Sequence, residues 1–171
     1  NKHGIQDLPE NLEISHADDV VDMHDDPASV PRKRKNSSMV MGLQMLAKGE
    51  GDAFVSAGST GALLTGATLI VKRVKGIRRA AMGPAMPNKA GGKTVICDCG
   101  ANAECTPEFL LQFGLVGSAF VKKQFGVENP KVGLLNIGTE DTKGTPLQKE
   151  AYALLTDAHE KGLLNFVGNV E

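Results

Sequence analysis

A short loop after an apolar run carries one lysine and two carboxylates: Lys143, Glu140 and Asp141, within GLLNIGTEDTKG at residues 133–144. The apolar run is typical of a buried parallel strand, and the Gly/Thr/Asn loop after it presents the charged groups to solvent. Open α/β sheets keep their chemistry in such loops. Lys143 is therefore a candidate site residue, and a merely solvated lysine is the alternative. Glu140 and Asp141 would hold it by ion pairing, or one would act as an acid/base group.

A second loop, SAGSTG at residues 56–61, follows an apolar run and opens a helix. Its glycines let the backbone approach an anion, its hydroxyls add donors, and the helix N-terminus contributes about half a positive charge. These features favour phosphate binding, although such turns also occur only to pack tightly. The loop lacks the G-K-[ST] of a Walker loop and a clean G-x-G-x-x-G, so a nucleotide site is not favoured.

A third loop, DCGAN at residues 98–102, places a carboxylate at a strand end and an amide beyond it. Asp98 either orients the loop through backbone N–H groups or contacts substrate. Asn102 would give a neutral donor to a carbonyl or oxyanion. Three nearby cysteines lack the spacing and the fourth ligand of a zinc site and are typical of reduced thiols. We therefore expect neither a metal nor a cofactor.

The remaining candidates are charged runs, while the histidines lie outside the three loops, which argues against His-dependent nucleophilic catalysis. With a net charge of −1, two basic runs mean a patterned surface. Either the runs are a solvated face, or an acidic partner docks on them. The acidic stretch at residues 18–26 is expected to be a solvated loop. Nucleic acid is not an expected partner, because no aromatic residues are interleaved with the basic ones. The basic residues are Arg32, Lys33, Arg34, Lys35, Lys72, Arg73, Lys75, Arg78 and Arg79, and the histidines are His3, His16, His24 and His159.

Alternating strands and helices must position these loops, and they predict an α/β fold with a mostly parallel, doubly wound sheet and helices on both faces. Strands are expected at residues 12–15, 52–56, 80–86, 94–98, 131–137 and 163–167, and helices at 60–74, 107–125 and 146–161. A further helix of about three turns should follow the N-cap residues at 36–38 and end near 48–49. A Gly-containing turn is expected at residues 88–93. The 171 residues suit a single segment, with a peripheral strand and acidic loop at 1–31. The chain begins with Asn and stops after a strand, so we expect an internal segment of a longer, cytoplasmic protein.

These loops resemble the PlsX family, the phosphate:acyl-carrier-protein acyltransferases of bacterial phospholipid synthesis. The resemblance rests on residues 35–39, 52–62, 98–102, 132–141, 143–144 and 165–171. Ser59 stands where the family usually has Asn, and Cys99 where it has Val. The initial strand and the C-terminal part of family members, which are about twice as long, are not present in this sequence.

The resemblance implies a fold like that of isocitrate and isopropylmalate dehydrogenases and phosphotransacetylases. It implies that inorganic phosphate attacks the thioester of acyl-acyl-carrier protein, giving acyl phosphate and the free carrier. The expected catalytic residues are Lys143 and Asn102. The expected phosphate- and substrate-binding residues are Ser37, Ser38, Ser56, Gly58, Ser59, Thr60, Gly61, Asp98, Gly100, Asn136, Gly138, Thr139, Glu140 and Asp141.

The basic runs are expected to dock the acyl carrier protein, the full-length protein to form a homodimer, and peripheral membrane association to accompany it. Two other interpretations stay open. One is a phosphotransacetylase-like or dehydrogenase-like enzyme that uses coenzyme A or a dinucleotide. The other is a non-catalytic module that binds an acidic partner through its basic runs.

Overall fold

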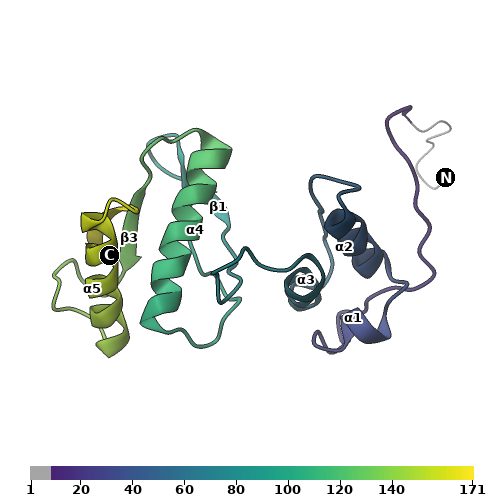
Figure 1. Cartoon of the computed structure of the whole chain (residues 1–171), viewed down its shortest axis with the longest axis horizontal. Helices are drawn as coiled ribbons and strands as arrows, with labels where there is room; N and C mark the ends of the chain where they lie inside the picture. Colours follow the sequence, from purple (N-terminus) through teal and green to yellow (C-terminus); the bar gives the residue numbers. More distant parts are fainter. Residues whose placement is uncertain (1–8) are drawn as a thin grey trace. The chain divides into compact units, whose positions relative to one another are not determined.

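The computed structural model describes residues 9–171, so His3 and the first eight residues of the segment predicted at 1–31 lie outside the described residues. The chain divides into two compact units, one ending at Lys72 and the other spanning Arg73–Glu171. Figure 1 shows the helices and strands of both units and labels those for which there is room. The 56–61 loop belongs to the first unit, and the loops at 98–102 and 136–144 belong to the second.

Helices build the described part of the first unit: α1 (Val30–Lys33), α2 (Ser38–Lys48), α3 (Thr60–Gly66) and the π-helical turn η1 (Ala67–Val71). The Ser37 hydroxyl caps α2 by accepting a hydrogen bond from the Val40 N–H, and Gly49 ends it in the left-handed region at φ 78°. The helix of about three turns predicted to end near Lys48 and Gly49 is confirmed. A single apolar cluster holds the helices together: Val30, Met39, Val40, Leu43 and Ala62.

The strands predicted at residues 12–15 and 52–56 are wrong, because both segments are irregular. Within the described part of the first unit, the strand-like pairing is one isolated parallel bridge between Asp19 and Ser37. A strand needs a neighbour for its N–H and C=O groups, and neither segment has one. Phe54 packs instead against the helical cluster, whereas Val55 is 92% exposed.

The helix predicted at residues 60–74 forms but ends earlier. α3 runs into the π-helical turn η1, and helical structure stops at Val71. Lys72 follows with φ 73° and ψ 170°, a backbone conformation outside the helical regions, which ends the helix. The Ser59 hydroxyl caps α3 by accepting from the Ala62 N–H. The 56–61 loop therefore opens a helix, as the sequence predicts.

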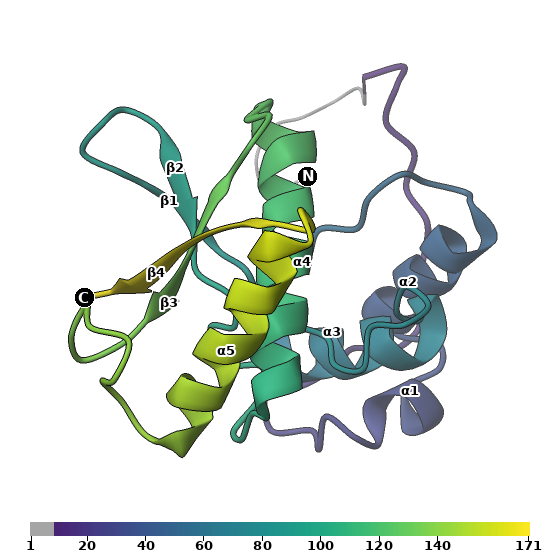
Figure 2. The same ribbon diagram turned by 60° about the vertical axis from the view of Figure 1, so that its left-hand side comes forward.

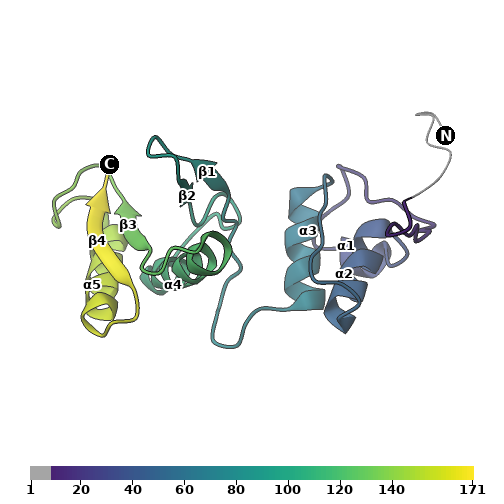
Figure 3. The same ribbon diagram turned by 90° about the horizontal axis from the view of Figure 1, so that it is seen from above.

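The second unit contains a parallel strand pair, β3 (Lys131–Leu135) and β4 (Asn165–Val170), connected through α5 (Pro146–Glu160). α5 and α4 (Pro107–Phe125) pack together next to these strands, as Figures 2 and 3 show. The apolar cluster under the strands consists of Leu134, Ala151, Leu155, Ala158, Leu164 and Phe166. On the other side Leu135 is 67% exposed, so the prediction of helices on both faces is not met in residues 9–171.

The strands β1 (Ala85–Pro87) and β2 (Lys93–Val95) form an antiparallel hairpin. The Asn88 N–H donates to the Gly92 carbonyl, and the Asn88 side chain accepts from the Gly92 N–H, which closes the predicted turn. So short a connection permits only antiparallel pairing, so the expectation of parallel strands is wrong for this pair. Both strands are shorter than predicted, although the Cys99 N–H still reaches the Met82 carbonyl beyond them.

The remaining elements of the second unit follow the sequence closely. Thr106 caps α4, Pro107 fills its first position and Gly126 ends it at φ 67°, which confirms the helix predicted at 107–125. The helix predicted at 146–161 and the strands predicted at 131–137 and 163–167 are confirmed to within a few residues. Within residues 9–171, none of the helices has the length and apolar character that crossing a membrane requires.

Candidate functional site

The loop that carries Lys143 is closed by Asn136, which stands directly after β3. The Asn136 N–H donates to the Val170 carbonyl at 2.9 Å, which ties the start of the loop to the end of β4. Its side-chain oxygen accepts from the Ile137 N–H at 2.9 Å, and its amide nitrogen donates to the Lys143 carbonyl at 3.1 Å. Asn136 therefore fixes both ends of the loop.

Two glycines make this compact loop possible. Gly144 has φ 90°, and a Cβ there would lie 2.6 Å from the Asn136 side-chain oxygen. Gly138 is buried, and a Cβ there would lie 2.8 Å from a Glu140 carboxylate oxygen and 3.0 Å from Cγ of Lys143. Larger residues at either position would displace the side chains that the loop presents.

Asn169 on β4 supports the turn from below. It is 6% exposed, and its amide nitrogen donates to the Glu140 carbonyl at 2.7 Å. The Lys143 N–H donates to the same carbonyl at 3.2 Å, so one acceptor joins β4 to the lysine. Sequence reasoning did not identify Asn169 as a site residue. The available signal was a polar side chain within the strand residues 165–170.

The Lys143 ammonium is held loosely. Its Nζ lies 3.9 Å from a Glu140 carboxylate oxygen, and the two side chains are 47% and 59% exposed. An exposed ion pair at this distance contributes little to stability. The backbone of the turn is therefore fixed while the positive charge stays free to meet an anion. Thr139 and Asp141 are exposed beside it.

The 98–102 loop is organised around the Asp98 carboxylate. Asp98 accepts hydrogen bonds from the N–H groups of Met82 at 2.7 Å, Ala101 at 3.3 Å and Asn102 at 2.8 Å. Burial by itself would raise the pKa of Asp98, but the bonds from Met82 and Asn102 outweigh it and lower the pKa. Asp98 thus orients the loop, which is one of the two roles that the sequence leaves open.

The Asn102 amide is also engaged. Its nitrogen donates to the Ala80 carbonyl at 2.9 Å and to the Asp98 carboxylate at 3.2 Å, which uses both amide hydrogens. An oxyanion could receive a hydrogen bond from this group only if one of these bonds broke.

The cysteines near this loop are not activated. Burial is the main cause that raises the pKa of the Cys97 and Cys105 thiols, and the charge of Asp98 raises it further, so neither thiol is an activated nucleophile.

The 56–61 loop of the first unit uses two of its hydroxyls internally. Ser56 accepts from the Gly58 N–H at 3.1 Å, and Ser59, which is 7% exposed, caps α3. Thr60 is exposed, whereas Gly61 packs against Pro27, to which a Cβ would approach within 3.0 Å. Because this loop and the other two belong to different units, their convergence in one crevice stays a prediction.

The structure gives different environments to the two serines proposed near α2. Ser37 is fully buried, and its hydroxyl donates to the Arg34 carbonyl at 2.7 Å as well as capping the helix. A ligand cannot reach Ser37 in this arrangement. Ser38 is exposed and stays available.

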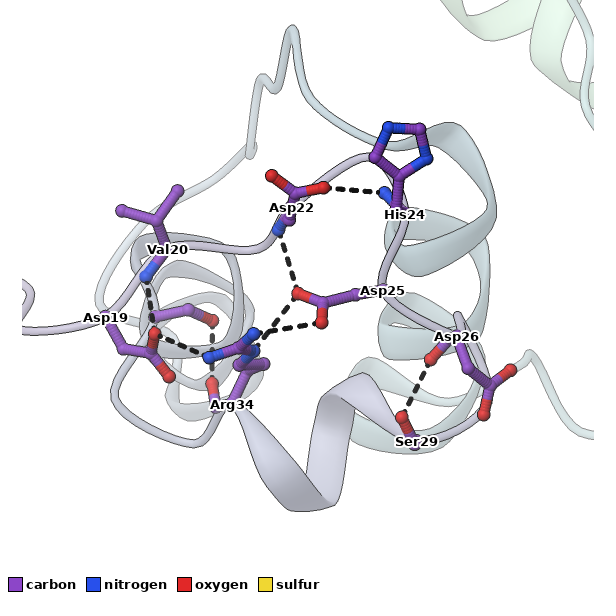
Figure 4. A network of polar contacts seen from close by, with 9 residues as sticks. Asp19, Val20, Asp22, His24, Asp25, Asp26, Ser29 and Arg34 are labelled. Carbon is purple, nitrogen blue, oxygen red and sulfur yellow. Dashed lines mark hydrogen bonds and ion pairs between the residues drawn. The ribbon is translucent and has the colours of Figure 1, made fainter.

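Arg34 is drawn out of its basic run by the acidic loop, as Figure 4 shows. Its guanidinium donates two hydrogen bonds to Asp25, at 3.1 and 3.0 Å, and one to Asp19 at 3.2 Å. The bond with Arg34 is the main cause that lowers the pKa of Asp25. Asp22 joins the network because its N–H donates to Asp25 at 2.8 Å. The acidic stretch is therefore a structured partner of Arg34 rather than a plain solvated loop.

A cavity of about 500 Å³ lies at the opposite end of the β3–β4 pair from the Lys143 loop. It is lined by α4, the C-terminal end of α5 and the turns that lead into the two strands, and includes Ser118, Lys122, His159 and Asn165. The Lys143 loop instead follows the carboxyl end of β3. The cavity is therefore separate from the candidate site.

Comparison with known proteins identifies the family of the chain that carries these loops. The model of a family described as "Fatty acid synthesis protein" matches residues 3–171. A phosphate acyltransferase of Caldanaerobacter subterraneus is 44% identical over 98% of this chain and 49% of its own length. A phosphate acyltransferase of Clostridium novyi is 48% identical over 95% of this chain and 47% of its own length.

A solved structure resembles the fold as well. The EutD phosphotransacetylase from Staphylococcus aureus matches with a TM-score of 0.63 and 26% identity, over 80% of this chain and 42% of that one. The chain spans about half the length of the curated relatives it matches. The similarity in sequence extends across all three loops, since the family model covers them. The chain belongs to the fatty acid synthesis protein (PlsX) family, whose matched members are named phosphate acyltransferases.

Proposed function

We propose that the full-length protein transfers a fatty acyl group from acyl-acyl-carrier protein to inorganic phosphate, giving acyl phosphate for phospholipid synthesis. The observation that carries this proposal is 44–48% identity to proteins named phosphate acyltransferase over nearly the whole chain. Because the chain covers about half of those relatives, the activity is proposed for the whole protein. The anion-ready Lys143 loop supports the same conclusion.

The proposed reaction needs no covalent enzyme intermediate. A phosphate oxygen attacks the thioester carbonyl carbon, a C–O bond forms, and the C–S bond breaks as the tetrahedral intermediate collapses. The carrier leaves as a thiolate and takes up the proton that the phosphate gives away. The enzyme must hold an anion, offset the growing negative charge and orient the thioester.

Each requirement has a candidate among the described residues. We assign the phosphate cradle to the 56–61 loop, where Gly58 and Thr60 are exposed at the start of α3. Lys143 would offset the transition-state charge, since its ammonium has only a 3.9 Å contact with Glu140. Asn102 would act mainly through the shape of the 98–102 loop, because its amide hydrogens are already used.

The finer features of the fold and assembly are part of the same proposal. For the full-length protein we infer a doubly wound sheet related to phosphotransacetylases and to isocitrate and isopropylmalate dehydrogenases, and the EutD likeness supports the phosphotransacetylase part. A cytoplasmic homodimer that associates peripherally with the membrane is the proposed state of the full-length protein. Neither a metal nor a cofactor is needed for the reaction as written.

The likeness to EutD favours one second candidate, a phosphotransacetylase-like enzyme that uses coenzyme A. The test offers the full-length protein the same acyl group on carrier protein or on coenzyme A, with and without phosphate. Thiol release and acyl hydroxamate formed with hydroxylamine are both measured. We expect phosphate-dependent release of thiol from the carrier thioester alone or from both thioesters, with a much higher kcat/KM for the carrier thioester than for the coenzyme A thioester. A preference for the coenzyme A thioester would favour the second candidate, and no turnover would favour a binding module.

A further inference from the structure

We propose that residues 73–79, which we name the basic turn, form the surface on which an acidic protein partner docks. We further propose that Gln112 of α4 is the residue that holds this turn in its docking shape. The proposal rests on the proposed function, under which the acidic partner is the acyl carrier protein.

The Gln112 side chain clamps the basic turn through both atoms of its amide. Its oxygen accepts from the Arg78 N–H at 2.8 Å, and its nitrogen donates to the Gly76 carbonyl at 3.1 Å. These contacts join segments 34 and 36 residues apart in sequence. The turn also closes on itself, because the Arg73 Nε donates to the Ile77 carbonyl at 3.2 Å. Its backbone is therefore fixed on α4.

The charged side chains of the basic turn are exposed to solvent. Arg73, Lys75, Arg78 and Arg79 are all exposed. The Arg79 guanidinium lies 5.6 Å from the centre of the Phe109 ring, a cation–π contact that orients it along α4. Val74 is 77% exposed among these cations. A cationic patch with an exposed apolar side chain matches an acidic protein that combines charge steering with apolar contact.

The other basic run is less suited to an acidic partner. The Arg34 guanidinium is hydrogen-bonded to Asp19 and Asp25, and the acidic stretch at residues 18–26 contributes further carboxylates. An acidic protein approaching Arg32 and Lys33 would meet this negative charge. The basic turn, by contrast, has Glu108 as a carboxylate neighbour. The hydrogen bond with Thr106 lowers the pKa of Glu108, and the charge of Arg78 lowers it by a smaller amount. Charge complementarity therefore favours the basic turn.

The basic turn is also joined directly to the candidate site. Ala80, the residue after Arg79, accepts a hydrogen bond from the Asn102 amide at 2.9 Å. Two residues later, the Met82 N–H donates to Asp98 at 2.7 Å. A partner seated on the turn would thus rest on the segment that supports the 98–102 loop, which suits delivery of a thioester to that loop.

The test uses the full-length protein with Arg78→Glu and Gln112→Met. Because steering by charge changes encounter rates by about 10- to 1000-fold, we expect Arg78→Glu to raise KM for the acyl-carrier substrate roughly tenfold or more. Gln112→Met should raise it by a smaller factor, since the cations remain but lose their fixed position. The kcat at saturation and KM for phosphate should not change. The effect of Arg78→Glu should fade near 1 M salt, where the screening length is about 3 Å.

The matched control is Lys123→Glu, an equal charge reversal at an exposed lysine in the last turn of α4. It should leave the carrier KM unchanged. A rise in carrier KM of the same size in all three variants would overturn the proposal, because the effect would then not depend on the basic turn. An unchanged carrier KM in Arg78→Glu would also overturn it. So would loss of binding to phosphatidylglycerol vesicles with carrier kinetics intact, because the turn would then be a membrane surface.

Direct binding of unlabelled carrier protein, measured by calorimetry, separates this proposal from the proposed function. If the carrier binds, Arg78→Glu weakens it, and yet no acyl phosphate forms, docking stands and the proposed activity fails. If acyl phosphate forms but neither variant changes carrier affinity, the activity stands and docking on the basic turn fails.

Discussion

Replacing Lys143 by alanine in the full-length protein should lower kcat strongly without unfolding the chain. The lysine side chain is 47% exposed and contacts Glu140 at 3.9 Å. Its backbone, not its ammonium, carries the hydrogen bonds to Asn136 and Glu140 that shape the loop. Alanine keeps these backbone bonds, so the geometry of the loop should survive the substitution.

The two expected magnitudes are well separated. Loss of an exposed ion pair and a surface side chain should lower the free energy of unfolding by less than about 0.5 kcal/mol. Loss of a group that stabilises charge in the transition state should raise the barrier by roughly 2.7–4 kcal/mol, about 10²–10³ in kcat. Lys143→Arg should retain part of the activity, because it keeps the charge at a different reach.

The assay measures acyl phosphate formation and the thermal midpoint on the same preparation. Lys149→Ala, an exposed lysine on α5, serves as the control and should change neither quantity. Near-normal turnover in Lys143→Ala would show that the lysine is only a solvated surface residue. A collapsed thermal midpoint would show instead that its role is structural.

Three further outcomes are expected. Phosphate titration should shift the amide resonances of residues 58–61, because glycines, hydroxyls and the start of α3 meet there; shifts confined to other regions would contradict the cradle. Asp98→Ala should lower stability at neutral pH by about 1–3 kcal/mol in urea unfolding, since partly buried N–H groups lose their acceptor. Because the folded pKa of Asp98 is lowered, its contribution is full above the unfolded value near 3.8 and is lost as pH falls through the folded pKa, so wild type and variant should converge in acid. Asn169→Leu should lower kcat, because the Glu140 carbonyl loses its hydrogen bond from Asn169. Stability should change little, because the substitution also removes a buried side-chain oxygen that lacks a partner among the described residues. An unchanged kcat would show that Asn169 has no positioning role.

Helices were predictable from local signals in this chain. Thr106, Pro107 and Gly126 mark both ends of α4, and Ser37 and Gly49 mark those of α2. Such signals depend on residues a few positions apart, so a sequence displays them fully. The strand predicted at 52–56 depends instead on pairing with a segment distant in sequence. The apolar residues around Val55 suggest a strand, but they carry no information on whether such a partner exists, and in the described residues the segment is irregular.

The candidate site was predictable in its loops but not in its internal bonds. The sequence placed Lys143, Asp98 and Asn102 in loops after strands. It could not show that Asn102 spends both amide hydrogens within its loop, or that Asn169 reaches across to Glu140. It also could not show that Arg34 leaves its basic run for Asp19 and Asp25, because that pairing depends on how the acidic loop folds back.

The central claim is that phosphate itself attacks the thioester, with no acyl-enzyme intermediate. A single turnover of the full-length protein with acyl-carrier thioester and ³²P-labelled phosphate tests this most directly. The account predicts no carrier thiol without phosphate, and with phosphate one labelled acyl phosphate for each thiol released. A burst of thiol in the absence of phosphate, with acyl group retained on the protein, would contradict it.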